Sequence, residues 1–77
     1  MSEKEDVGTL RMQSSGRWAV CRSGQEPVEI RSGELFRVEV DGVLRVTRME
    51  RDPDGPCYSM DGYELCEGLR AAIGTGE

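Results

Sequence analysis

The side chains with the clearest chemical potential in this sequence are carboxylates, and they are concentrated in its last third. Residues 50–77 hold seven acids and two bases, whereas residues 1–49 hold eight of each, so the whole formal charge of −5 comes from the last third. Carboxylates held together on a rigid sheet can imitate a nucleic-acid backbone and bind arginine or lysine. The candidate partner-binding residues are Glu50, Asp52, Asp54, Asp61, Glu64 and Glu67. The alternative is that these acids occupy solvated turns and keep a small protein soluble.

Arginine supplies all but one of the basic residues and defines a second candidate site. Arg37, Arg45 and Arg48 would form a nucleic-acid-binding stripe of the small-barrel kind, with an aromatic side chain as the stacking platform. We expect Arg37 and Arg45 to lie opposite each other on an outer face beside Glu39. The alternative is a mixed charged face with weak ion pairs. The net acidity argues against direct nucleic-acid binding.

The residue types needed for catalysis or metal binding are poorly represented. There is no histidine, and the three cysteines are an odd number without CxxC spacing. They make a poor zinc site and lack a histidine base, so we expect free, mostly buried thiols, with a Cys57–Cys66 disulfide as the alternative. The run Asp52-x-Asp54-Gly55 lacks the third oxygen ligand and the final glutamate of a calcium loop. We expect no enzymatic activity, no metal and no cofactor.

Chain length allows one small domain with a thin core, because the sequence has only 77 residues. No apolar run approaches the roughly 20 residues that a membrane-spanning helix needs. The N-terminal MSEKEDVG has no apolar h-region, so we expect a cytoplasmic protein without a secretory signal. We predict a flexible arm over residues 1–15, a single domain over 16–73 and a tail over 74–77.

The elements that must position these side chains are organised around the stretch Leu35–Met49. Two runs of alternating apolar residues flank Asp41-Gly42, which is a strong hairpin signal. We expect Phe36, Val38, Leu44 and Val46 to share the buried face. That pairing requires a three-residue loop, Val40-Asp41-Gly42, with a bulge at Gly42. Because Met49 has the opposite parity, we expect a second bulge near Thr47–Arg48 to bring it inward.

Shorter strands are predicted on both sides of this hairpin. Residues 17–22 and 28–30 alternate apolar residues, and residues 7–12 are an optional edge strand. Residues 57–60 form a strand with Tyr58 and Met60 inward, and residues 69–73 form either a last strand or one helical turn. Short strands at this spacing predict an all-β protein. The expected fold is a five- to six-stranded antiparallel, partly open SH3-like barrel with the Leu35–Met49 hairpin at its centre.

The order of these segments resembles a small bacterial and phage family that is classed as a domain of unknown function. The resemblance covers about residues 16–73 and follows an "EI..G..F.V" run, an "R.E" strand end and a closing "Y......L..G..A.I". The matching positions are Glu29, Ile30, Gly33, Phe36, Val38, Arg48, Glu50, Tyr58, Leu65, Gly68, Ala71 and Ile73. The resemblance implies a compact β-barrel and a link to mobile elements. It implies no functional residues.

These observations favour a non-enzymatic acidic interaction protein. In its most specific form it is a phage-encoded inhibitor, anti-CRISPR-like in size and charge, acting as a DNA mimic on a basic partner. The alternatives are a nucleic-acid-binding small barrel and a structural or oligomerisation module that pairs through an exposed edge strand. We expect a protein partner with a basic surface, no membrane, and a monomer or weak homodimer.

Overall fold

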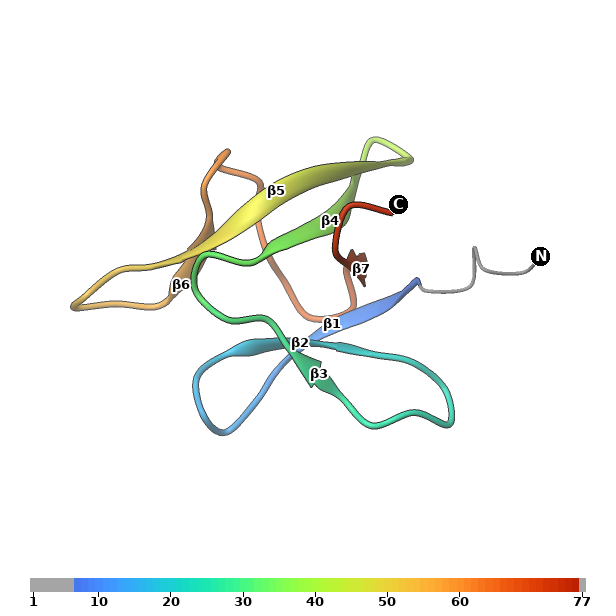
Figure 1. The fold of residues 1–77 in the computed structure, drawn as a ribbon, viewed down its shortest axis with the longest axis horizontal. Helices are drawn as coiled ribbons and strands as arrows, with labels where there is room; N and C mark the ends of the chain where they lie inside the picture. The colour runs from blue at the N-terminus through green and yellow to red at the C-terminus, as the bar shows by residue number, and fades with distance from the viewer. Residues whose placement is uncertain (1–6, 77) are drawn as a thin grey trace.

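The computed structural model describes residues 7–76, and within them the chain forms seven antiparallel strands and no helix. The strands are β1 (Gly8–Met12), β2 (Trp18–Cys21), β3 (Val28–Glu29), β4 (Leu35–Val40), β5 (Val43–Arg51), β6 (Cys57–Ser59) and β7 (Arg70–Ile73). They make one open sheet in the order β3-β2-β1-β7-β4-β5-β6. In Figure 1, β1, β2 and β3 lie below β4, β5 and β6, and the turn between β5 and β6 projects away from the rest of the sheet. The predicted small, partly open, antiparallel β architecture is confirmed, with seven strands instead of five or six.

β1 lies inside the sheet, between β2 and β7. Leu10 pairs with Val20 of β2, and Gly8 pairs with Ala71 of β7. Leu10 is fully buried. The predicted flexible arm over residues 1–15 is therefore wrong for Gly8–Met12, while residues 1–6 lie outside the described part of the chain. Residues 8–12 do form the optional strand, but it lies inside the sheet and not at its edge, because β7, distant in sequence, pairs with its second side.

The central hairpin closes through two residues, and the predicted three-residue loop is wrong. Val40 pairs directly with Val43, which leaves Asp41 and Gly42 as the turn. Their φ values are 54° and 82°, and positive φ at both central residues is the type I′ geometry that matches strand twist. Asp tolerates this left-handed conformation better than most side chains, and glycine adopts it freely. The turn chemistry, and not the spacing of apolar residues, sets the register.

The faces of the hairpin differ accordingly from the prediction. Phe36 pairs with Thr47 and Val38 with Arg45, so Thr47 and Arg45 lie on the face of the sheet that carries the core. We call this the inner face. Leu44 is half-buried and Val46 is 44% exposed, both on the opposite, outer face. Phe36 and Val38 are fully buried, as predicted, whereas Leu44 and Val46 do not share their face.

β5 continues past the hairpin without the expected second bulge. Met49 has the parity of Thr47, is fully buried, and pairs with Ser59 of β6. Its amide donates to the Glu34 carbonyl (2.9 Å) and its carbonyl accepts from Gly33 (2.7 Å). In the actual register Met49 already points inward, so no bulge is needed to bury it.

The core occupies the inner face and draws on six of the seven strands. Its buried members share apolar character and are Leu10, Trp18, Val20, Ile30, Phe36, Val38, Met49, Cys57 and Ala71. Ile30 follows β3 directly and is held by its amide hydrogen bond to the Trp18 carbonyl (2.9 Å). Residues 57–60 do form the predicted strand and turn, but Cys57 and Ser59 face inward instead of Tyr58 and Met60.

A close approach of β1 to β2 depends on Gly8. A Cβ there would fall on the Cys21 carbonyl oxygen and within 2.6 Å of Arg22 Cγ. Backbone cannot move aside as a flexible side-chain end can, so only glycine allows this contact. The consequence is that the Arg22 side chain lies directly over β1.

β7 closes the sheet between β1 and β4, as the strand alternative for residues 69–73 predicted. Ala71 and Ala72 are both fully buried. Arg37 of β4 donates from Nε to the Gly74 carbonyl (3.1 Å) and from Nη2 to the Ile73 carbonyl (2.9 Å). This guanidinium holds the chain after β7 against the hairpin. Of the predicted tail, residue 77 lies outside the described residues.

Candidate interaction surface

Three of the predicted acidic residues lie on the projecting part of the β5–β6 hairpin, and a fourth, Asp61, lies at its base beside Thr47. Glu50 is near the end of β5, Asp52 and Asp54 are in the β5–β6 turn, and Asp61 follows β6. We call residues 50–61 the acidic arm. Its turn is ordered by the Asp52 carboxylate, which accepts a hydrogen bond from the Asp54 amide (3.0 Å). Asp52 and Asp54 therefore lie in an ordered turn at the tip of the β5–β6 hairpin, whose ribbon is seen in Figure 1.

Glu64 and Glu67 lie outside this arm. Both are exposed in the segment that connects β6 to β7. The Glu67 carboxylate accepts from the Met12 amide (2.7 Å) and lies 3.6 Å from Arg11 Nη1. The prediction grouped six acids. In the structure, Glu67 lies against β1 and its carboxylate is close to the Arg11 guanidinium of the same chain.

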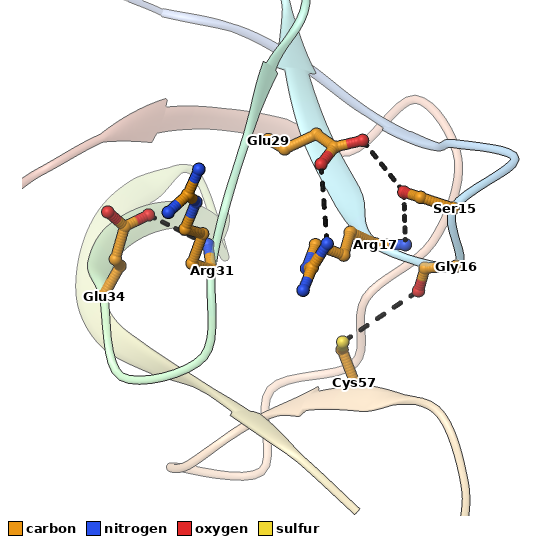
Figure 2. Close-up of polar contacts among 7 residues, drawn as sticks. All are labelled: Ser15, Gly16, Arg17, Glu29, Arg31, Glu34 and Cys57. Carbon is orange, nitrogen blue, oxygen red and sulfur yellow. Dashed lines mark hydrogen bonds and ion pairs between the residues drawn. The ribbon is translucent and has the colours of Figure 1, made fainter.

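Glu29 and Glu34, outside the arm, also have partners within the chain. Glu29 of β3 accepts from Ser15 Oγ (2.9 Å) and lies 3.9 Å from Arg17 Nη1, as Figure 2 shows. Glu34 accepts from the Arg31 amide (2.9 Å) in the same view. In the middle of the sheet, a further ion pair joins two neighbouring strands.

That further pair is between Glu39 of β4 and Arg70 of β7 (3.8 Å). Against these three ion pairs, Glu50, Asp52, Asp54 and Asp61 take part in none within residues 7–76. The acidic arm thus groups four of the carboxylates that the described chain leaves without a cation, and the others among residues 7–76 are Glu26, Glu34, Asp41 and Glu64.

Exposed apolar side chains lie next to the arm on the outer face. Tyr58 pairs with Glu50 across β5 and β6, and Leu35 pairs with Arg48 across β4 and β5. The Met60 amide donates to the Arg48 carbonyl (2.9 Å), which extends the β6 ladder by one residue. The exposed apolar side chains of this face are Leu35 (42%), Val46 (44%), Tyr58 (49%) and Met60 (52%). We call these four residues the outer strip; the prediction that Tyr58 and Met60 point inward is wrong.

The inward position between Tyr58 and Met60 is taken by a hydroxyl pair. Ser59 Oγ and Thr47 Oγ1 are 2.8 Å apart and both residues are buried. Each hydroxyl also lies 3.4 Å from a backbone amide, Tyr63 for Ser59 and Asp61 for Thr47. This buried polar contact fixes the facing of β6 and anchors the turn that follows the arm. Sequence reasoning missed it because a lone Ser and a lone Thr carry no periodic signal.

The three arginines of the alternative site are separated by the hairpin register. Arg37 pairs with Val46 and Arg45 with Val38, so Arg37 and Arg45 lie on opposite faces and the expected pairing between them is wrong. Arg37 is half-buried and is used in binding the backbone after β7. Arg48 remains exposed on the outer face, in the middle of the outer strip. The arrangement offers two exposed arginines on opposite faces of the sheet, Arg45 and Arg48, and not a stripe of three.

Within the described residues, the cysteines, the possible metal ligands and a shallow hollow do not form a further candidate site. All three cysteines are free: Cys57 is buried with Sγ 4.0 Å from the Gly16 carbonyl oxygen (Figure 2), Cys21 is half-buried and Cys66 is exposed. Among residues 7–76, no group of three or more acids, cysteines or histidines is placed to hold a metal ion. In the same part of the chain, no helix is long and apolar enough to cross a membrane. A shallow hollow of about 300 Å³ is lined by Val20, Arg22, Val28 and Ile73.

The fold and this surface together define a small all-β protein with one open antiparallel sheet and an acidic, partly apolar outer end. Comparison with known protein families, with curated proteins and with solved structures finds no match to the chain.

Proposed function

We propose that the protein is a non-enzymatic interaction protein whose acidic arm binds a basic surface of a partner protein. The observation that supports this proposal is the difference between its carboxylates. Glu29, Glu39 and Glu67 pair with arginines of the same chain, whereas those of residues 50–61 pair with none in the described chain. Charged groups left without internal partners on a projecting hairpin are accessible to arginine or lysine of another molecule.

The finer form of the proposal names the partner as a nucleic-acid-binding protein. A groove that binds a phosphate backbone is basic, and closely spaced carboxylates compete for it by charge. An inhibitor of this kind, phage-encoded and anti-CRISPR-like, is supported by the small size and by the net charge of −5. The candidate contact residues are Glu50, Asp52, Asp54 and Asp61, with Glu64 nearby in sequence.

The test neutralises the arm and compares it with a change of equal charge elsewhere. The variant D52N/D54N/D61N raises the net charge by three, and the control S23K/Q25K/E26Q raises it by the same amount in the exposed β2–β3 loop. Each protein is immobilised and exposed to bacterial lysate at low and high salt, with duplex DNA as competitor. We expect the wild type and the control to retain nucleic-acid-binding proteins that salt or DNA displaces, and the arm variant to lose them. Equal retention by all three proteins would reject the proposal.

A further inference from the structure

We propose that the outer strip is the centre of the interface that the acidic arm surrounds, and that it takes an aromatic side chain of the partner flanked by arginine or lysine. This inference rests on the proposed function and deepens it. Protein interfaces combine a desolvated apolar centre with a polar rim. Here Leu35, Val46, Tyr58 and Met60 supply the centre, and the carboxylates of residues 50–61 supply the rim.

The strip is contiguous because of the strand register. Arg48 lies between Leu35, its pair on β4, and Met60, which its carbonyl binds on the far side. Val46 and Glu50 are the neighbours of Arg48 on the same face of β5, and Tyr58 pairs with Glu50. Three adjacent segments therefore contribute apolar side chains around one guanidinium. Single exposed apolar residues are ordinary, but a contiguous group with a charged edge is typical of a binding surface.

The rest of the outer face differs in composition. Outward positions on β1, β3 and β7 carry Thr9, Arg11, Glu29 and Arg70, and three of these four are joined in ion pairs. Exposed apolar residues on this face are confined to the end of the sheet that also carries unpaired carboxylates. This coincidence connects the apolar strip and the charged rim in one surface.

Charge complementarity selects a basic partner over a second copy of the chain. Two copies packed through this face would bring two acidic arms together, which is unfavourable. Area also argues against a dimer built on the strip alone. An interface of standard size buries about 800 Å² per partner, roughly a sixth of the 5053 Å² surface of this molecule, so the strip needs its rim to reach that size.

An aromatic side chain fits the centre best. The Arg48 guanidinium can stack on an aromatic face, and Tyr58 offers a ring nearby for edge or offset contact. Arginine or lysine on either side of that aromatic residue would meet Glu50 and the carboxylates of the arm. The partner segment is therefore a basic one with an aromatic anchor.

The experiment selects peptides that bind the purified protein from a random linear peptide library. The affinities of the selected peptides are then measured by fluorescence polarisation. We expect the enriched peptides to carry an aromatic residue between basic residues. We also expect Tyr58→Ser and Val46→Ser each to weaken their binding about tenfold. The matched control is Val43→Ser, which removes an equally exposed apolar side chain (51%) from the inner face of the same strand and should leave affinity unchanged.

A second measurement does not depend on any variant. Amide chemical-shift changes in the wild type on peptide addition should be confined to residues 35, 46, 48, 50, 52, 54 and 58–61. The inference would be overturned if no peptides were enriched or if the enriched peptides lacked an aromatic residue. It would also be overturned if neither serine substitution changed the affinity of the peptides. If D52N/D54N/D61N still abolishes binding of basic proteins in that case, the proposed function stands without the strip. If the serine variants act and the arm variant does not, the proposed function fails instead.

Discussion

The two ends of the sheet differ in whether Glu29 and Glu67, or the acids of residues 50–61, have ion-pair partners within the described chain. At the β3–β2–β1 end, Glu29 and Glu67 bind arginines and backbone or hydroxyl donors of the same chain. At the β5–β6 end, the acids of residues 50–61 have no internal cation within the described residues, and exposed apolar side chains lie beside them. At the first end, ion pairs and hydrogen bonds of the carboxylates connect loops to strands. At the second end, the carboxylates form no ion pair within the described residues. The acids at the first end therefore contribute to the structure, and we propose that those of residues 50–61 contribute to binding.

The largest test of this comparison substitutes one glycine at each end. Gly8→Ala would place a Cβ on the Cys21 carbonyl, so β1 and β2 must separate, and we expect a loss of about 3 kcal/mol in the free energy of unfolding. Gly55→Ala in the acidic arm meets only Asp52 at 3.4 Å, an ordinary contact, and should change it by less than about 0.5 kcal/mol. Urea denaturation followed by Trp18 fluorescence measures both. Equal losses would mean that the two ends are equally constrained.

The next test removes the buried contact that joins the acidic arm to the core. Ser59→Ala leaves the Thr47 hydroxyl buried beside an apolar surface, which should lower stability by about 2 kcal/mol. The double variant T47V/S59A leaves no hydroxyl unsatisfied. It also removes the acceptors of the Asp61 and Tyr63 amides, but these contacts are long and only part-buried, so the double variant should recover part of the loss. The urea midpoints of the single and double variants measure this. A double variant less stable than Ser59→Ala would show that the hydroxyls stabilise the protein as acceptors for the two amides and not as a pair.

A smaller effect separates two acids of one connecting segment. Glu67→Ala removes the acceptor of the Met12 amide and the partner of Arg11, and should cost about 1 kcal/mol. Glu64→Ala, exposed in the same segment, is the control and should be neutral. Thermal unfolding at equal ionic strength compares the two. If both variants were neutral, the first end of the sheet would not depend on its acids for stability.

The smallest effect is expected for the acids of the arm. D52N/D54N/D61N should leave the free energy of unfolding within about 0.5 kcal/mol of wild type, because these carboxylates have no cation to lose and Asn can also accept at position 52. A loss above 1 kcal/mol, measured by urea denaturation, would contradict the view that their charge serves binding and not stability.

Much of the architecture follows from local signals in the sequence. The Asp41-Gly42 dipeptide and the alternation around it place the central hairpin correctly, and the short apolar runs at 17–22, 28–30 and 57–60 are confirmed as strands. The register was mispredicted because Leu44 and Val46 were assumed to be core residues. Their exposure is decided by turn geometry and by partners such as Thr47, which is buried for a contact made in space with Ser59.

The candidate site was predictable in part for the same physical reason. Charge density along the chain identified residues 50–61, since neighbours on a hairpin stay neighbours in space. Glu67 was misassigned because its partner Met12 is 55 residues away in sequence. The outer strip was missed because Tyr58 and Met60 were assigned inward on apolarity alone, whereas their facing depends on the partner of Ser59.

The tight turn at Asp41 and Gly42 has a consequence for what can happen to this chain. A strand alternates its sides, so one residue added between those two, with a two-residue turn kept, would shift the pairing by one and exchange the inward and outward positions of β5. Leu44 and Val46 would then be offered to Phe36 and Val38, a combination that is chemically reasonable in isolation. A single-codon insertion there would leave the amino-acid sequence almost unchanged but give β5 a different exposed face.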